Sequence, residues 1–195
     1  PIVETQLEPA LALRPTHLSF NGGGNDILRP KADLRVILDL FAHVLRRCDE
    51  EGVQLVLLSG ADPTGGIPMG RVMKRRGDEL SVAVEELIAD RPDIIRAYNW
   101  FDSELATPGY WSEDRLHMNS RGHHRVAARV LESLGVPVPD GCWSLPELPV
   151  RGPRGISYYR EHVGPWVKRR LTGTSSGDGR EPKFGGGWNA VQGIS

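Results

Sequence analysis

The chain has 195 residues, and its 24 basic and 25 acidic side chains leave a formal net charge of −1. This length suits one domain, and a composition with 39% hydrophobic and 25% charged residues is ordinary for a soluble globular protein. A near-neutral charge gives no overall attraction to nucleic acid, and no apolar run approaches the length of a membrane span. The composition therefore argues against a nucleic-acid-binding protein and against a membrane-spanning one.

Cysteine usage and the first residues bear on the compartment. Cys48 and Cys142 form no recognisable motif, which makes a reduced cytoplasm the default, although two cysteines are also compatible with one disulfide bond. No basic and apolar leader opens the sequence, so no secretory signal is visible and we expect a cytoplasmic protein. Because the sequence opens at Pro1 without an initiating Met, this absence argues only weakly for the compartment.

The first third of the sequence predicts the end of a helix, a strand and a long helix. Residues 8–13 indicate the helix end, and residues 16–20 form a short β-leaning run that leads into glycines. Apolar residues then recur at helical spacing over residues 34–47. Asp33 is the expected N-cap of this helix, and Gly52 is its expected stop.

A buried strand and a second helix follow. Residues 53–58 form an almost continuous apolar run, which is typical of a strand buried on both faces of a parallel sheet. A loop rich in Gly and Pro over residues 59–70 leads to a helix expected over residues 71–89, which Pro92 ends. The expected apolar side of this helix consists of Val82, Leu87 and Ile88.

The next segment predicts a third strand over residues 94–101, a loop over residues 102–118 and a helix over residues 120–134, with Asn119 as its N-cap. The expected buried stripe of that helix consists of Val126, Val130, Leu131 and Leu134. The alternation of strands and helices predicts an α/β fold with a parallel sheet and helices on both faces, joined by right-handed crossovers.

The composition of the sequence changes after Gly135, where prolines recur in a stretch with little hydrophobic periodicity. We expect a short helix within residues 158–171, interrupted at Pro165, and a flexible segment from Thr172 onward. The predicted organisation is therefore a domain over residues 1–136, followed by a Pro/Gly-rich and partly flexible C-terminal extension over residues 137–195.

The first motif with chemical content follows the strand predicted at residues 16–20. It reads Gly23-Gly24-Asn25-Asp26. The glycines permit a tight backbone and a close approach of a ligand, and the Asn25 amide offers two N–H donors to a cleft. Gly-Asn-Asp is also good turn chemistry, and taken alone this motif favours an ordinary turn.

The second motif places Asp114 three residues before His117, just ahead of the last predicted helix. In this arrangement the carboxylate accepts a hydrogen bond from one imidazole nitrogen, and the other nitrogen is free to take a proton from a nucleophile. The alternative is a surface His beside a surface Asp. A metal site is also suggested by three nearby histidines, His117, His123 and His124. No further carboxylate lies at ligand spacing, so we expect no metal.

Taken together, Gly-x-Asn-Asp over residues 23–26 and Asp-x-x-His before the last helix resemble blocks III and V of the SGNH/GDSL hydrolase family. The sequence segments that contain or follow these motifs, at residues 19–30, 111–128 and 164–179, are similar to those of bacterial, actinobacterial-like members. The resemblance covers residues 1–179. It implies a three-layer α/β/α, flavodoxin-like fold whose parallel strands run in the order 2-1-3-4-5, of which this sequence holds strands 3, 4 and 5.

The resemblance also implies roles for four residues. Asp114 is the orienting acid and His117 the general base of a Ser-His-Asp triad, while Asn25 is a donor of the oxyanion hole and Gly23 shapes its turn. In the family, the nucleophilic Ser and a second oxyanion donor lie upstream, in a Gly-Asp-Ser block and a Gly block. No Gly-Asp-Ser triplet occurs in this sequence, and Ser59 is a poor substitute because it matches no family nucleophile.

This absence leads to two expectations. The sequence corresponds to an N-terminally truncated member that is inactive alone, rather than to an enzyme that has lost catalysis, because acid, base and oxyanion Asn are all present. In such a chain, the strand at residues 16–20 is an exposed edge that is central in the family fold. We therefore expect marginal stability or association of the chain alone.

The leading interpretation is a serine esterase or lipase-type hydrolase that acts on small ester or acyl substrates and needs no cofactor. The alternatives are a non-catalytic ligand-binding module or degenerate fragment of the same fold, a metal-dependent hydrolase using His117 and His123, and a nucleic-acid-binding tail at residues 168–170. The loop at residues 60–70, with Trp100 and Trp111, is expected to line the substrate pocket. Substrate identity and oligomeric state stay open.

Overall fold

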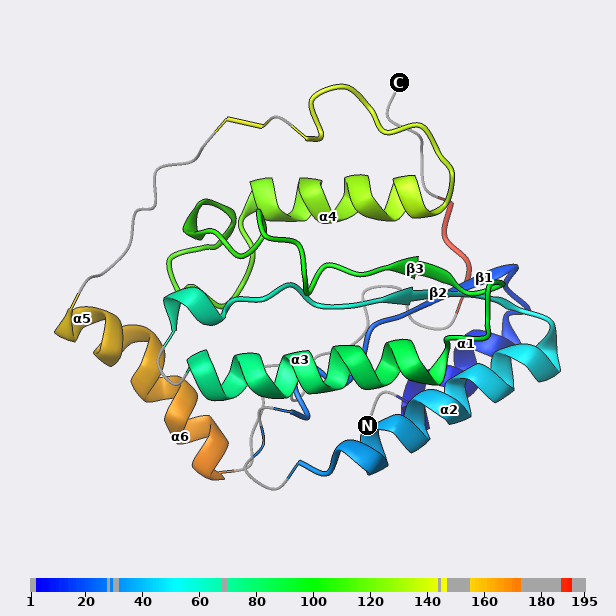
Figure 1. Ribbon diagram of the computed structural model, residues 1–195, viewed down its shortest axis with the longest axis horizontal. Coiled ribbons are helices and arrows are strands. Elements are labelled where there is room, and N and C mark those ends of the chain that lie inside the picture. The colour runs from blue at the N-terminus through cyan, green and yellow to red at the C-terminus, as the bar shows by residue number, and fades with distance from the viewer. Residues whose placement is uncertain are drawn as a thin grey trace.

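The computed structural model describes residues 3–27, 29, 32–67, 70–143, 145–146, 155–172 and 187–190 (Figure 1). In chain order its elements are a π-helical turn (Val3–Leu7), α1 (Glu8–Ala12), β1 (His17–Phe20), α2 (Leu34–Glu51), β2 (Gln54–Leu58), a 3-10 turn (Thr64–Gly66), α3 (Gly70–Leu87), β3 (Ile95–Ala97), a second 3-10 turn (Pro108–Tyr110), α4 (Ser120–Ser133), α5 (Ile156–Tyr158), a second π-helical turn (Tyr159–Val163) and α6 (Gly164–Thr172).

The three strands form a parallel sheet in the order β1-β2-β3. In the central strand β2, three consecutive residues are buried: Leu55, Val56 and Leu57. Successive side chains of a strand point to opposite faces, so this run means that both faces of the sheet are covered. The parallel sheet predicted from the apolar runs is thereby confirmed.

Strand β3 is shorter than the eight residues predicted from the sequence, because the chain leaves the ladder after Ala97. Instead of pairing with β2, the backbone N–H of Asn99 donates to Ser59 Oγ at 2.7 Å. The Asn99 side-chain amide donates to the carbonyl oxygens of Ser59 and Ala97, at 3.1 Å and 3.3 Å. These side-chain contacts replace strand hydrogen bonds, which ends the strand at its carboxyl edge.

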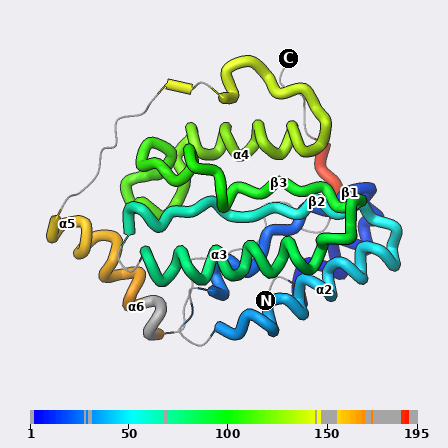
Figure 2. Tube along the Cα trace, viewed as in Figure 1, coloured from blue at the N-terminus to red at the C-terminus, as the bar shows by residue number. Residues whose placement is uncertain are grey.

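Helices cover the sheet from two sides (Figures 1 and 2). α1, α2 and α3 lie below the strands in Figure 1, and α4 lies above them. The crossovers β1-α2-β2 and β2-α3-β3 advance in one direction across the sheet, so a right-handed connection puts both helices on the same face. The expected three-layer α/β/α arrangement is confirmed.

The ends of α2 follow the predicted capping chemistry. Asp33 accepts a hydrogen bond from the Arg35 backbone N–H at 2.9 Å, and Gly52 ends the helix in the left-handed region with a φ of 65°. The helix runs to Glu51, four residues beyond the predicted end at Arg47. Arg47 pairs with Glu51 at 2.9 Å, one turn away, which supports this last turn.

The main core lies between the sheet and the layer of α1, α2 and α3. The predicted apolar side of α3 is wrong for two of its three residues, since Val82 is 49% and Leu87 38% exposed, whereas Ile88 is fully buried. The buried side is formed instead by Met73, Gly77, Leu80 and Val84. Their spacing of four, three and four residues is helical, but Gly77 conceals the stripe because it carries no apolar side chain.

Helix α4 begins as predicted, with Asn119 Oδ1 accepting from the Gly122 backbone N–H at 3.1 Å. Its predicted buried stripe is wrong, since Leu134 is exposed and the other three members are only half-buried. The buried residues of α4 are small, namely Gly122 and Ala128. A Cβ at Gly122 would stand 2.5 Å from the Tyr110 carbonyl oxygen, so α4 packs by close backbone approach rather than by large apolar side chains.

The C-terminal helical segment runs from α5 through the π-helical turn into α6 without the interruption predicted at Pro165. Proline lacks an N–H and its ring crowds the preceding turn, and the wider π-helical turn at Tyr159–Val163 directly precedes the helix that contains it. The flexible segment predicted from Thr172 onward falls mostly outside the described residues, and the domain boundary predicted after residue 136 stays a prediction. Within residues 187–190, Trp188 Nε1 donates to the Leu13 carbonyl oxygen at 3.2 Å.

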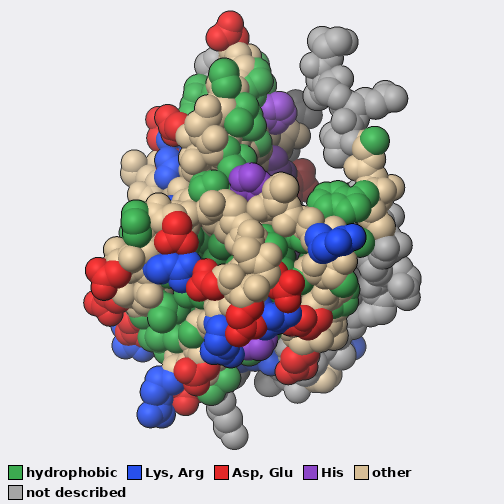
Figure 3. Space-filling view, turned by 90° about the vertical axis from the view of Figure 1, so that its right-hand side faces the viewer, with side chains coloured by type: hydrophobic (Ala, Val, Ile, Leu, Met, Phe, Trp, Pro, Cys, Tyr) green, Lys and Arg blue, Asp and Glu red, His purple; other side chains and the backbone are tan. Residues whose placement is uncertain are grey.

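The amino ends of the strands meet at the end of the molecule that Figure 3 shows, where acidic and basic side chains are intermixed. A hollow of about 250 Å³ opens there, beside Cys48 and Gln54. Its one cation, Arg91, pairs with Asp49 at 2.6 Å and with Asp93 at 2.7 Å. This hollow lies at the edge of the sheet opposite to the loops described below.

Cys48 is buried and Cys142 is half-buried, and both thiols are free. None of the described helices combines the length and the apolar character that crossing a membrane requires.

Candidate active site

A buried ion-paired carboxylate anchors the loop that follows β3. Asp102 accepts from the backbone N–H groups of Glu104 and Leu105 at 3.0 Å and 3.2 Å. It also pairs with two guanidinium groups of α4, at 2.9 Å to Arg125 and 3.2 Å to Arg129. Burial raises the pKa of Asp102, but these hydrogen bonds and charges outweigh it and hold the pKa below its usual range. The carboxylate therefore fastens the loop to α4.

An aromatic residue, Trp111, shapes the next part of the same loop. Trp111 is buried and its Nε1 donates to the Leu105 carbonyl oxygen at 2.7 Å. Trp111 also forms an antiparallel bridge with Met118, and the Ser112 N–H donates to the His117 carbonyl oxygen at 2.8 Å. Residues 111–118 are therefore closed on themselves like a small hairpin, which we call the Asp-His loop.

The Asp-His loop brings Asp114 and His117 into direct contact. His117 Nδ1 lies 2.5 Å from Asp114 Oδ2, and the backbone N–H groups of Leu116 and His117 donate to Asp114 Oδ1 at 3.0 Å each. Ser112 Oγ lies 2.8 Å from the same Oδ1 and 2.8 Å from the His117 carbonyl oxygen, so its single hydrogen serves one of them at a time. The loop therefore contains the predicted contact between the carboxylate and the imidazole.

The carboxylate of Asp114 is held in its charged form. Burial raises its pKa, but the hydrogen bonds from His117, Leu116 and Ser112 prevail and lower the pKa to about 2. A charged carboxylate accepts the Nδ1 hydrogen and thereby leaves the lone pair on Nε2. The His117 side chain is 71% exposed, so that nitrogen faces solvent. The pair can act as a general base that is oriented by an acid.

The loop after β1 carries the other two predicted site residues. Gly23 has a φ of 79°, and its carbonyl oxygen accepts from the N–H groups of Asp26 and Ile27 at 3.0 Å each. A Cβ at Gly23 would stand 2.9 Å from Leu80, so both the backbone conformation and the packing on α3 require glycine there. Asn25 is exposed on this turn.

The two motifs share the carboxyl edge of the sheet, since one follows β1 and the other follows β3. One strand separates β1 from β3, which corresponds to about 10 Å at ordinary strand spacing. Within the described residues, no hydrogen bond joins Asn25 to Asp114 or His117. The structure thus brings Asp114 and His117, the expected acid and base, into contact, and keeps Asn25, the expected oxyanion donor, on a separate loop.

Ser59 has a structural role at the carboxyl edge of the sheet. Its hydroxyl oxygen accepts from the backbone N–H groups of Asn99 at 2.7 Å and Trp100 at 3.1 Å. These bonds tie the ends of β2 and β3 together and occupy the lone pairs that a nucleophile would need. Ser59 is therefore a connector between two loops in this structure.

The two tryptophans expected near the substrate also make internal contacts. Trp100 packs on Gly77 of α3, and its Nε1 donates to Asp78 at 2.8 Å. The indole N–H of Trp111 is used inside its own loop, as described above. The loop at residues 60–70 does reach the Asp-His loop, since its Gly66 carbonyl oxygen accepts from Arg115 Nη1 at 3.3 Å.

Sequence reasoning missed two residues that support the pair. Ser112 stands two residues before Asp114, and a hydroxyl at that spacing is a signal for a side-chain-capped turn. Tyr158 donates from its hydroxyl to the Asp114 carbonyl oxygen at 3.2 Å across 44 positions of the chain, and no local signal marks it. His123 and His124 are exposed on α4, and no group of three or more His, Cys, Asp or Glu side chains suited to a metal occurs within the described ranges.

Comparisons with known proteins assign the chain to a protein family. Residues 1–125, more than half of the 195, match the model of the GDSL-like Lipase/Acylhydrolase family. No curated protein and no solved structure matches the chain. The match agrees with the parallel sheet between two helical layers and with the family resemblance of the two motifs. The chain therefore belongs to the GDSL-like lipase/acylhydrolase family, whose general function is acyl hydrolysis.

Proposed function

We propose that Asp114 and His117 are the acid and the base of a Ser-His-Asp triad that hydrolyses small ester or acyl substrates. The contact of 2.5 Å between His117 Nδ1 and Asp114 Oδ2 is the observation that carries this proposal. It is supported by the lowered pKa of Asp114 and by the exposure of the imidazole.

In the proposed reaction, His117 Nε2 takes the proton of a serine hydroxyl while the serine oxygen attacks the acyl carbon. The Asp114 carboxylate stabilises the imidazolium that forms, and His117 then gives the proton to the departing alcohol. Water repeats the sequence on the acyl-enzyme and releases the acid. The Asn25 amide donates a hydrogen bond to the oxyanion of the tetrahedral intermediate, and Gly23 shapes the turn that presents Asn25.

We propose that the nucleophile of this triad is not among these 195 residues, a proposal supported by the lack of a Gly-Asp-Ser triplet and by the engagement of Ser59 in loop contacts. We therefore propose that the chain alone does not hydrolyse esters. Activity is expected when a segment that carries Gly-Asp-Ser on a strand is joined before Pro1 and pairs with β1, at the edge of the described sheet.

The test compares hydrolysis of a short-chain p-nitrophenyl ester by four proteins: this chain, an extended chain with the Gly-Asp-Ser segment, and the extended chain with either His117→Ala or His124→Ala. His124 is the matched control, because it is an exposed histidine on the first turns of α4. We expect activity only in the extended chain and its His124→Ala form. Loss of the base should lower kcat by at least about a thousandfold.

Activity that survives His117→Ala would contradict the proposed site. The lack of a Gly-Asp-Ser triplet favours one alternative, a non-catalytic module that binds an acyl ligand at the same loops. That alternative predicts an inactive extended chain that still binds a non-hydrolysable acyl analogue, and weaker binding after His117→Ala.

A further inference from the structure

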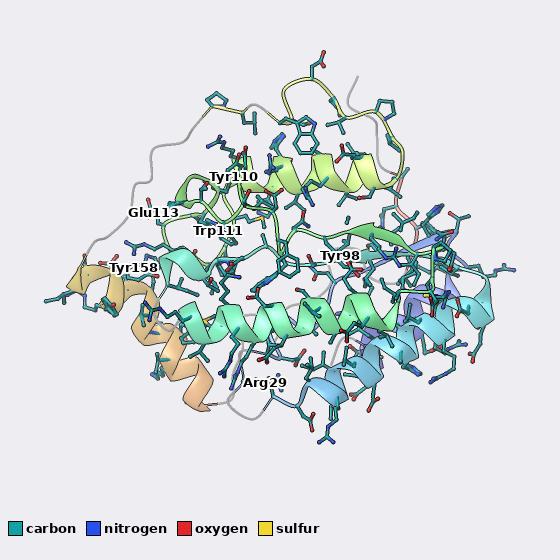
Figure 4. The ribbon with its side chains drawn as sticks, in the orientation of Figure 1. Arg29, Tyr98, Tyr110, Trp111, Glu113 and Tyr158 are labelled. Atoms are coloured by element: carbon teal, nitrogen blue, oxygen red, sulfur yellow. The ribbon has the colours of Figure 1, made fainter. Side chains whose placement is uncertain are left out.

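The C-terminal helical segment, α5 through α6, lies against the Asp-His loop at the carboxyl edge of the sheet (Figures 1 and 4). Figure 4 labels Tyr158 of this segment beside the loop that carries Glu113. We propose that Tyr158 is a positioning residue for the Asp114–His117 pair, so that the C-terminal segment belongs to the functional unit. The catalytic consequence of this inference rests on the proposed function, whereas its structural part does not.

Two contacts join Tyr158 to the Asp-His loop. The Tyr158 hydroxyl donates to the carbonyl oxygen of Asp114 at 3.2 Å. The guanidinium carbon of Arg115 lies 4.1 Å from the centre of the Tyr158 ring, within the range of a cation-π contact. One aromatic side chain therefore holds two consecutive residues of the loop, and the first of them is the proposed acid.

Tyr158 makes these contacts from a buried position. The side chain is only 4% exposed, although it belongs to a helix whose neighbouring Ile156 is 88% exposed. Burial raises the pKa of the Tyr158 hydroxyl, so it keeps its proton at neutral pH and acts as a donor. A buried hydroxyl needs a hydrogen-bond partner, and the Asp114 carbonyl oxygen supplies it.

The loop needs such support because Arg115 adopts an unfavourable backbone conformation. Its φ is 59°, in the left-handed region where a residue with a Cβ is strained. This residue makes the turn that lets the N–H groups of Leu116 and His117 point back to the Asp114 carboxylate. The Tyr158 ring and the Gly66 carbonyl oxygen both contact the Arg115 guanidinium, and these contacts help to hold the residue in this conformation.

The matched family segment does not include this support. The match ends at residue 125, and Tyr158 lies well beyond it. The acid and base are thus placed by the family domain, while one of the contacts that fixes their loop comes from the C-terminal segment. In this proposal the functional unit reaches at least α5, beyond the domain boundary predicted after residue 136.

The structural test uses hydrogen–deuterium exchange of the peptide that covers residues 111–118, in this chain and in the extended chain. Tyr158→Phe removes only the hydroxyl, and Tyr158→Ala also removes the ring. We expect exchange of the Leu116 and His117 amides to rise about three- to tenfold with Phe, as for one net hydrogen bond, and further with Ala. Ile156→Ala, two positions away and exposed, should match the wild type.

Exchange in the peptides of α2 and β2 controls for global unfolding. Should Tyr158→Ala unfold the protein, the Phe variant decides, since it keeps the ring and its packing. Unchanged exchange of the Asp-His loop in a folded Tyr158→Phe protein, with unchanged exchange in Tyr158→Ala wherever that variant folds, would overturn the inference. Faster exchange that is equal in the Ile156→Ala control would overturn it as well.

The catalytic arm measures ester hydrolysis by the extended chain. We expect Tyr158→Ala to lower kcat at least tenfold with little change in KM, and Tyr158→Phe to restore most of the activity. If no extended chain is active, the proposed function fails while the exchange experiment still decides the role of Tyr158. If the Tyr158 variants are as active as the wild type and His117→Ala is inactive, the proposed function stands and the effect of Tyr158 on catalysis is refuted.

Discussion

The hydrogen bonds around Asp114 predict a measurable dependence of stability on pH. Its pKa falls from an ordinary value of 3.8 to about 2 in the folded protein. Each unit of difference corresponds to about 1.4 kcal/mol, so the charged carboxylate contributes on the order of 2 kcal/mol to the free energy of unfolding. Since the folded-state pKa is the lower one, this contribution is present above pH 3.8 and is lost as the pH falls towards 2.

The perturbation is Asp114→Asn, and the assay is urea unfolding followed by circular dichroism at several pH values. At pH 7 we expect the variant to be less stable than the wild type by about 2 kcal/mol, and this gap to close as the pH approaches 2. Other carboxyl groups titrate in the same range, so the difference between the two proteins is the quantity to follow. Glu113→Gln is the control, because the Glu113 carboxyl makes none of these hydrogen bonds.

A gap that stays constant from pH 7 to pH 2 would refute the reasoning, because it would arise from packing rather than from the charge of Asp114. The absence of any gap at pH 7 would show that the hydrogen bonds to the carboxylate give no net stability. An equal gap for Glu113→Gln would attribute the effect to the net charge of the loop.

Two further substitutions test the connections between the loops. Gly77→Ala should destabilise the protein by at least about 2 kcal/mol in thermal unfolding, because the new Cβ would stand 1.9 Å from the Trp100 ring, whereas Gly24→Ala meets no atom within 4 Å and should change little. Ser59→Ala should cost about 1–3 kcal/mol in urea unfolding, because the N–H of Asn99 loses its acceptor, but the folded extended chain should keep its esterase activity. Complete loss of activity in a folded Ser59→Ala protein would make that serine the nucleophile.

Some features of this protein could be predicted because they depend on residues that are close in the sequence. The apolar run at residues 53–58 predicts a strand that is buried on both faces, and Asp33 and Asn119 predict two helix starts. Asp114 and His117 meet within one turn, so their contact needs only local backbone geometry. In these cases the interacting groups are neighbours whichever way the rest of the chain folds.

Other features are decided only when distant surfaces meet. The buried side of α3 escapes a hydrophobicity pattern because Gly77 contributes to it by the space it leaves for Trp100. Tyr158 reaches the Asp114 carbonyl oxygen from 44 positions away, and nothing in its local sequence distinguishes it from the exposed Tyr159 that follows. The sequence alone thus determines the order of elements and the Asp-x-x-His pair, whereas tertiary packing decides which surfaces support that pair, because burial depends on partners that no local pattern records.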